Sequence, residues 1–219
     1  MKQLLATALA IGILASCNNA PKADKAEASE KQEVKTAEGN GYNIDITSSN
    51  VGWVGTKVGG SHNGSFKLKD GSLAVKDNAI TGGNFTIDIA ALQDNDLTGE
   101  DKGKLEGHLK SPDFFDVAKY PTAKFEITSI APADAASLKD AVLKDATHII
   151  QGNLTLKDST KNVTFPAKVS VSDTEVSAAA NFNIDRSEWG IVWDKDTNPK
   201  DWVISNMVNI KLDIKAPKK

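Results

Sequence analysis

An alternation of apolar and polar residues with a period of two constrains the fold of this chain more than any other feature. It begins near Tyr42 and recurs to Ile214, for example along residues 85–89, 163–171 and 208–214. Successive side chains of a strand point to opposite faces, so the pattern predicts half-buried antiparallel strands. Turn-forming residues separate the runs. Many short strands joined by tight turns are typical of an all-β up-and-down barrel or a sandwich.

Two interruptions of the alternation predict short helical insertions. Residues 94–109 are charged and partly helical in pattern, with Leu105 and Leu109 four positions apart and therefore on one helix face. Residues 132–145 carry apolar residues at helical spacing, which predicts a surface helix between two strands. Both segments are therefore expected to lie outside the sheet.

A short stretch between the first insertion and the next strand carries two adjacent aromatics, Phe114 and Phe115. Pro112 precedes them and stops a longer helix by restricting the residue before it. Adjacent residues cannot share one strand face, and an ordinary surface loop rarely carries two large aromatics. They suit a turn that plugs the end of a hollow structure. A helix-loop-strand connector with a small satellite core explains the same spacing.

The same stretch resembles the signature of the YceI-like family. Two later stretches, GNLTLKDSTKNVTFP and NIDRSEWGI, match that family as well, and the resemblance extends over residues 42–214. It implies a lipocalin-like antiparallel barrel of about eight strands that binds polyisoprenoids or other long apolar chains. The residues that carry the signature in the first stretch are His108-Leu109, Asp113-Phe114-Phe115-Asp116, Tyr120-Pro121 and Phe125.

This chain departs from the family pattern in three places, the first being Trp53, where the family often has Phe. The family's usual His-Met-Gly reads here as Lys57-Val58-Gly59, and its Thr-Arg-Asp before the His-Leu pair is replaced within GEDKGKLEG. Ligand contacts made by the missing residues do not transfer to this chain. The departures therefore bear on the identity of the ligand more than on the fold.

The N-terminal segment predicts a bacterial lipoprotein. Lys2 precedes an apolar run that is too short to span a bilayer comfortably, and Leu14-Ala15-Ser16-Cys17 resembles a lipoprotein box. Residues 1–17 are thus expected to be a signal peptide in which Cys17, the only cysteine, becomes the acylated first mature residue. An ordinary secretory peptide with a chance cysteine is the alternative. This interpretation predicts an extracytoplasmic protein on a bacterial membrane, on its periplasmic side or at the cell surface.

Residues 18–40 are expected to be a flexible linker, followed by a barrel domain over residues 41–219. The linker is rich in Lys, Glu, Ala and Ser and contains no aromatic residue. Such a segment buries too little apolar surface to offset the entropy lost on ordering.

Composition and motifs disfavour catalysis, metal binding and nucleic-acid binding. The three histidines lie on separate elements without metal-ligand spacing, and the barrel has no cysteine for a thiolate nucleophile. A His108 pair with Asp113 or Asp116 is a weak candidate for acid–base chemistry, and a structural role at the helix junction is more usual. The net charge of −3 opposes binding to a phosphate backbone. No catalytic residue and no metal site is therefore predicted.

The alternation also predicts which side chains face a barrel interior. Three polar side chains, His108, Asp113 and Arg186, are placed with Phe114, Phe115 and Trp189 at the mouth of the pocket. Arg186 is expected to pair with a nearby aspartate or to contact a ligand head group, and Trp189, Trp193 and Trp202 to line the mouth or seal the barrel. The predicted lining consists of Phe85, Ile87, Phe125, Ile127, Val163, Phe165, Phe182, Ile184 and Ile210.

Three classes of function remain open at this point. The resemblance implies a carrier, store or sequestering protein for a polyisoprenoid, an isoprenoid quinone or a fatty-acid-like molecule, with no cofactor apart from such a lipid. A structural or stress-related lipoprotein whose barrel is filled by its own side chains is the alternative. An enzyme acting on a lipid is the third, and no convincing catalytic set supports it. The oligomeric state is open, with a homodimer among the alternatives.

Overall fold

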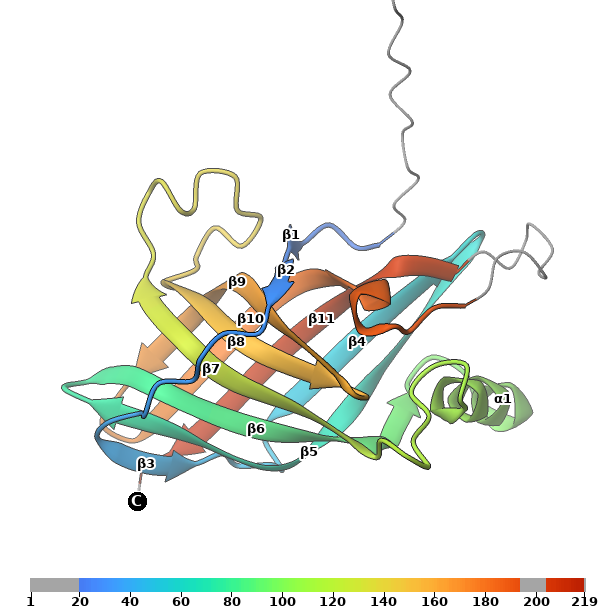
Figure 1. The fold of residues 1–219 in the computed structure, drawn as a ribbon, viewed down its shortest axis with the longest axis horizontal. Helices are drawn as coiled ribbons and strands as arrows, with labels where there is room; N and C mark the ends of the chain where they lie inside the picture. The colour runs from blue at the N-terminus through green and yellow to red at the C-terminus, as the bar shows by residue number, and fades with distance from the viewer. Residues whose placement is uncertain (1–19, 194–203, 219) are drawn as a thin grey trace, which may run out of the picture.

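Eight strands of the described chain close into an antiparallel barrel in which each strand pairs with its neighbours in sequence (Figure 1). The computed structural model describes residues 20–193 and 204–218. The first barrel strand pairs with the last. This confirms the up-and-down barrel that the family resemblance implied, where the alternation alone allowed a barrel or a sandwich. The barrel strands are β4 (Asn50–Lys57), β5 (Gly60–Lys76), β6 (Ala79–Asp94), β7 (Thr122–Pro132), β8 (His148–Leu156), β9 (Ser159–Val171), β10 (Glu175–Asp185) and β11 (Ile204–Pro217).

The two ends of the barrel are built differently. At the helix end, on the right in Figure 1, lie α1 (Gly99–Lys110), the loop 111–121 and the short 3-10 helix η1 (Arg186–Trp189). At the opposite end, named here the alanine end after Ala178–Ala180 of β10, the chain enters through β3 (Asn40–Asn43), which pairs with the end of β5. The helix end is thus covered by inserted elements and the alanine end by a continuation of the sheet.

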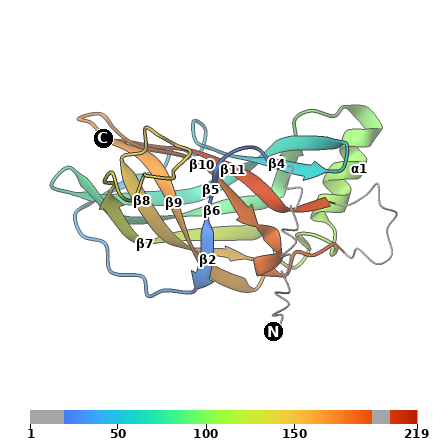
Figure 2. The ribbon, with the colours of Figure 1, turned by 90° about the horizontal axis from the view of Figure 1, so that it is seen from above.

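The strand pair β9–β10 separates toward the helix end. The two strands pair directly only between Lys168–Val171 and Val176–Ala179, next to the turn that joins them. Further along, β2 (Glu27–Glu30) pairs with β9 at residues 161–164, and β1 (Asp24–Lys25) runs parallel to β10 at Phe182 and Asn183. Residues 24–30, named here the strap, therefore fill the seam between the two strands (Figures 1 and 2).

The strap is where the structure differs from the flexible linker expected over residues 18–40. Ala26 is only 3% exposed. Further backbone contacts come from buried asparagines: the Asn153 side chain donates to Gln32 O at 2.7 Å, and Asn183 Nδ2 donates to Pro21 O at 2.9 Å. Backbone pairing with two open strand edges holds this segment, so its polar composition gave no indication of it.

The two predicted insertions have different outcomes. Residues 99–110 form α1, as the spacing of Leu105 and Leu109 indicates. The surface helix predicted over residues 132–145 is wrong, because this segment folds as a series of turns between β7 and β8. Asp134 accepts a hydrogen bond from Ser137 N–H at 2.7 Å and starts a turn. The helices of the described chain are too short and too polar to cross a bilayer.

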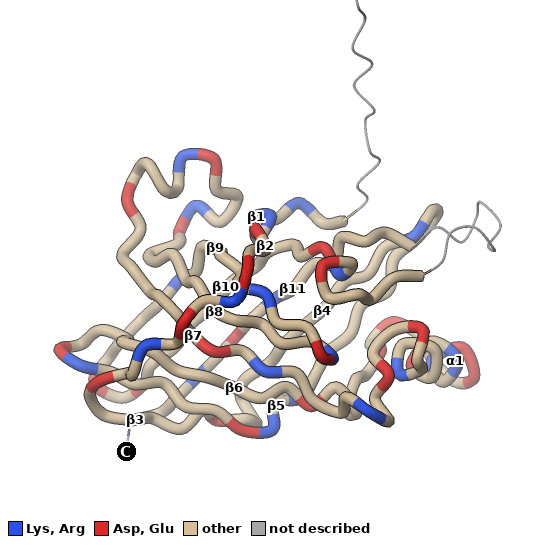
Figure 3. The backbone as a smooth tube through the Cα atoms, in the orientation of Figure 1, with Lys and Arg blue, Asp and Glu red and all other residues tan. Residues whose placement is uncertain are grey.

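Lys and Arg positions are interspersed with Asp and Glu positions along the backbone of the described chain (Figure 3). Lys124 pairs with Glu126 at 2.9 Å on β7, and Lys168 of β9 pairs with Asp145 at 2.9 Å. Along residues 20–193 and 204–218 this distribution forms no basic stripe that would follow a nucleic-acid backbone, and the net charge of the chain is −3.

Candidate ligand-binding cavity

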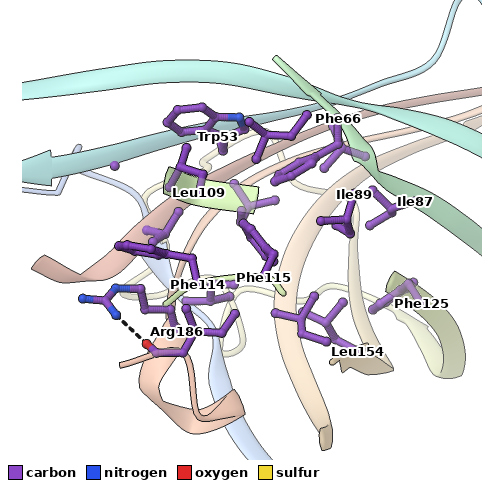
Figure 4. A pocket seen from close by; sticks show the side chains of 18 of the residues that line it. Trp53, Phe66, Ile87, Ile89, Leu109, Phe114, Phe115, Phe125, Leu154 and Arg186 are labelled. Atoms are coloured by element: carbon purple, nitrogen blue, oxygen red, sulfur yellow. Dashed lines mark hydrogen bonds between the residues drawn. The ribbon is translucent and has the colours of Figure 1, made fainter. Parts of the chain in front are cut away.

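A cavity of about 140 Å³ lies inside the barrel at the helix end (Figure 4). Its wall consists almost entirely of aliphatic and aromatic side chains, with Arg186 and Ser205 as the polar exceptions. Of the nine residues predicted to line a pocket, Ile127 lies elsewhere, against a second cavity of about 30 Å³ toward the alanine end. The other eight line the large cavity: Phe85, Ile87, Phe125, Val163, Phe165, Phe182, Ile184 and Ile210.

A layer of four phenylalanines, Phe85, Phe125, Phe165 and Phe182, crosses the barrel. Ring centroids lie 5.2 Å apart for Phe85 and Phe125, 5.9 Å for Phe125 and Phe165, and 4.1 Å for Phe165 and Phe182. The first three rings line both cavities, so this layer separates the large cavity from the small one. The Phe125 ring rests on Gly152, where a Cβ atom would overlap it. Gly152 is therefore a steric requirement of the layer.

The loop after α1 places two aromatics over the large cavity. Ser111 O accepts a hydrogen bond from Asp116 N–H at 2.8 Å, and Asp116 has a positive φ of 49°. This tight turn lets the adjacent Phe114 and Phe115 both reach the cavity, which an extended strand would prevent. Phe114 is buried, and Phe115 packs edge-on against Phe66 with centroids 5.7 Å apart. Figure 4 shows both rings projecting among the lining side chains.

His108 and Asp113 lie beside this plug rather than inside the cavity. The His108 ring packs edge-on against Phe114 and Trp193, at 5.0 and 4.5 Å between centroids. His108 Nε2 lies 3.3 Å from Asp113 Oδ2, and the Asp113 side chain is 56% exposed. An exposed ion pair of this kind contributes at most about 1 kcal/mol. The geometry therefore fits a positioning role for His108 at the junction between helix and barrel.

Arg186 has its hydrogen-bonding groups engaged by the backbone. Its Nε donates to Ser205 O at 3.2 Å, Nη2 donates to Ile204 O at 3.4 Å, and Nη1 donates to Ile191 O (Figure 4). The predicted pairing with an aspartate is absent from the ion pairs of residues 20–193 and 204–218. Burial lowers the pKa of Arg186, against the opposing effect of Asp185. Arg186 thus ties η1 to the start of β11 and forms part of the cavity wall.

The remaining predicted mouth residue, Trp189, lies behind the cavity wall. It is almost fully buried, and its Nε1 donates to Leu154 O at 2.9 Å. Asp185 caps η1 by accepting from Ser187 N–H at 3.0 Å, which fixes the turn that carries Trp189. Cys17 and Trp202 lie outside the described residues.

Sequence reasoning missed several residues of the wall. Trp53 and Phe66 belong to strands that the alternation predicts. The alternation does not show that these two residues lie at the same height in the barrel as Phe114 and Phe115. Leu109 of α1 and Ile191 after η1 reach the cavity from insertions. Alternation cannot assign a side chain outside a strand to the interior, so no sequence signal would have placed these two.

Known proteins resemble this chain in sequence and in fold. Protein YceI of Escherichia coli O6:H1 is 38% identical over 108 residues, which is 48% of each chain. A UPF0312 protein of Pseudomonas putida is 31% identical over 131 residues, 58% of this chain and 60% of the relative. The chain thus spans about half to three fifths of the length of these curated relatives.

Two solved structures share the fold at low sequence identity. The crystal structure of Burkholderia cenocepacia BcnA superimposes with a TM-score of 0.62 at 21% identity, covering 79% of this chain and 99% of BcnA. A polyisoprenoid binding domain from Saccharophagus degradans, implicated in plant cell wall breakdown, gives a TM-score of 0.58 at 16% identity, covering 81% and 98%. The YceI-like domain matches residues 42–216, which includes all eight barrel strands except the last residue of β11. This protein is therefore a member of the YceI-like family.

Proposed function

We propose that this protein is an extracytoplasmic lipoprotein that carries, stores or sequesters a long-chain apolar molecule in its barrel. The ligand class is a polyisoprenoid, an isoprenoid quinone or a fatty-acid-like molecule. The cavity of about 140 Å³ with its nearly uninterrupted apolar wall is the observation that carries this proposal. The fold shared with a polyisoprenoid binding domain from Saccharophagus degradans supports it.

The size of the cavity restricts how such a ligand binds. A volume of about 140 Å³ is close to the roughly 150 Å³ of an engineered cavity that binds benzene. It holds one segment of a long chain while Phe114 and Phe115 stay in place. Binding of the remainder requires the plug to move outward or the phenylalanine layer to part. Each Å² of apolar surface removed from water contributes about 25 cal/mol toward that rearrangement.

Filling the cavity with a larger side chain tests the proposal. The full chain, made in a bacterial host and purified in detergent, is extracted with organic solvent and the extract is analysed by mass spectrometry. Leu154, which lines the cavity, is changed to Trp, and the adjacent Thr155 to Trp as the matched control. Neighbouring strand residues point to opposite faces, so only Leu154→Trp occupies the cavity. We expect wild type and Thr155→Trp to retain a long-chain lipid and Leu154→Trp to lose it.

Two outcomes would contradict ligand binding in this cavity. Equal lipid in a folded Leu154→Trp protein would place the ligand elsewhere. A wild-type extract without any long-chain molecule would favour the alternative, a structural lipoprotein whose barrel is filled by its own side chains.

Membrane anchoring through Cys17 is the second part of the proposal. Only residues 18–23 separate Cys17 from the strap, so lipid chains at Cys17 would hold the barrel close to the membrane surface. Metabolic labelling with an alkyne fatty acid should mark wild type and leave Cys17→Ser unmarked. Equal labelling of the two proteins would refute acylation at this residue.

A further inference from the structure

Three side chains with metal-ligating atoms meet on the rim of the helix end, outside the lipid cavity. His62 lies near the start of β5, Asp94 is the last residue of β6, and Asp96 follows in the loop that leads to α1. Gly64 pairs with Asp94 across the two strands, so the same register continued by two residues places His62 opposite Asp96. The hydrogen bond from Asn95 N to Asn63 O, 2.8 Å, shows that this register does continue.

The spacing of the three groups suits one metal ion. One ligand atom from each residue lies within 4.8 Å of the other two. His62 Nδ1 and Asp96 Oδ2 are 2.9 Å apart. These two atoms share a hydrogen bond in the structure. Two ligands of a tetrahedral Zn²⁺ at bond lengths near 2.1 Å lie about 3.4 Å apart, so the pair needs to separate by only about 0.5 Å to hold one ion.

Asp94 provides an independent indication that a cation belongs here. Asp94 is 0% exposed, and its Oδ1 accepts hydrogen bonds from Leu97 N–H at 2.7 Å and from Asp96 N–H at 3.2 Å. Its Oδ2 is buried and has no hydrogen-bond partner in the described chain. None of the ion pairs among the described residues involves Asp94. A buried carboxylate oxygen without a donor or a positive charge is costly to a folded protein.

We propose that His62, Asp94 and Asp96 bind a divalent transition-metal ion of the Zn²⁺ class. Two carboxylates balance its charge, and imidazole favours such ions over Mg²⁺ or Ca²⁺. The His62 and Asp96 side chains are 25% and 31% exposed, so the ion has a route from solvent and water completes its coordination. The sequence predicted no metal site because the ligands come from two strands and the loop after the second, and their juxtaposition depends on a strand register that is visible only in the fold.

The ion would fasten the helix end of the barrel. It would bind β5 to the loop that begins α1, and Glu106 of α1 already accepts a hydrogen bond from Asp94 N–H at 2.9 Å. Leu109 of the same helix lines the lipid cavity. The site thus connects metal binding to the rigidity of the cavity cover, and it stands independently of the proposed lipid ligand.

Zinc titration of the full chain tests the site. Every protein carries Cys17→Ser to remove the only thiol, is stripped with EDTA, exchanged into buffer and titrated with Zn²⁺ against a chromogenic chelator. We expect one equivalent per chain. His62→Gln and Asp96→Asn should each weaken binding by at least about tenfold, since even the loss of an outer-shell partner of a ligand costs that much in other sites. His148→Gln, a histidine on β8 away from the site, is the matched control and should bind as the parent does.

Thermal unfolding of the same proteins supplies a second measurement. Zn²⁺ should raise the Tm of the parent and of His148→Gln, and should raise that of His62→Gln clearly less at the same Zn²⁺ concentration, because the stabilisation follows the affinity of the native state for the ion. Equal zinc affinity in the parent and both site variants would overturn the proposal. Absence of stoichiometric binding to the parent would also overturn it.

Discussion

The two ends of this barrel share the same eight strands and differ in what closes them. At the alanine end β9 and β10 pair directly. Residues 44–49 connect β3 to β4 there, and backbone hydrogen bonds tie this connection to the barrel strands. Ile44 N donates to Gly71 O at 2.9 Å, and Asp45 N donates to Lys215 O at 2.8 Å. At the helix end the same strands separate, the strap fills the seam, and side chains such as Phe115 cover the interior.

The difference explains why the large cavity lies at one end only. At the alanine end, backbone hydrogen bonds hold β3 and residues 44–49 against the barrel strands, and the cavity there has a volume of about 30 Å³. Side chains of insertions cover the helix end, and they leave about 140 Å³ beneath them. A cover of side chains can move without breaking the sheet, whereas a cover of paired backbone cannot. The helix end is thus the end suited to ligand entry.

Replacing Phe165 by Ala should remove the barrier between the large and the small cavity. Its ring is 2% exposed and lines both cavities, so its removal joins them. We expect a loss of about 3–5 kcal/mol in the free energy of unfolding, measured by denaturant titration. The folded variant should accept longer linear alcohols than wild type in a displacement assay with a fluorescent apolar dye.

Phe165→Leu serves as the better-folded companion of that variant, because it keeps an apolar side chain in the layer. It should show a smaller loss of stability and a smaller extension of the accepted chain length. An unchanged length limit in both folded variants would show that the phenylalanine layer does not bound the ligand site.

A charged side chain at the buried position of the strap should loosen the helix end of the barrel and leave the alanine end intact. Ala26 is buried between β9 and β10, so Ala26→Asp is expected to cost about 3 kcal/mol through an unpaired polar group. Hydrogen exchange should accelerate at residues 161–164 and 182–183, which pair with the strap. It should stay slow at 168–171 and 176–179, where β9 and β10 pair directly.

Lys25→Asp is the control for that substitution, because Lys25 is exposed and its neighbour Ala26 is not. It should leave exchange along the seam unchanged. If Ala26→Asp accelerates exchange equally at both ends, the strap supports the whole barrel rather than its helix end.

The strands and most of the cavity lining were predictable because they depend on one local rule, and the family resemblance decided for a barrel over a sandwich. Alternation assigns every second strand residue to the interior, and Phe85, Phe165 and Phe182 follow from it directly. Ile127 obeys the same rule and still lies at the other cavity, because alternation gives the face of a residue and not its height along the barrel.

The elements that escaped prediction depend on contacts between distant parts of the chain. The strap is held by backbone hydrogen bonds to strand edges, and Arg186 by the carbonyl groups of Ile191 and of the first residues of β11. The cluster of His62, Asp94 and Asp96 depends on a strand register. None of these leaves a pattern in composition or in nearest-neighbour spacing.

The smallest expected effect concerns Asp45, whose carboxylate organises the cover of the alanine end. Its Oδ1 accepts from the Thr47 hydroxyl at 2.7 Å and from Thr47 N–H at 2.9 Å, and its Oδ2 accepts from the Ser48 hydroxyl at 2.7 Å. These hydrogen bonds, those of the Thr47 and Ser48 side chains foremost, lower the pKa of Asp45 to about 2. The carboxylate has a pKa of about 3.9 in the unfolded chain.

Because the folded pKa lies below the unfolded one, Asp45 stabilises the fold above about pH 4 and loses that contribution as the pH falls toward 2. Asp45→Asn should therefore be slightly less stable than wild type at pH 7, and the difference should shrink between pH 4 and pH 2. Asp173→Asn, on the exposed turn between β9 and β10, is the control. On acidification of wild type, the protection factors for hydrogen exchange, which are corrected for the fall of the intrinsic exchange rate with pH, should decrease at residues 44–49 before they do at Phe114 and Phe115. The reverse order would mean that the side-chain cover of the helix end, and not the carboxylate-capped turn, is the more acid-sensitive closure.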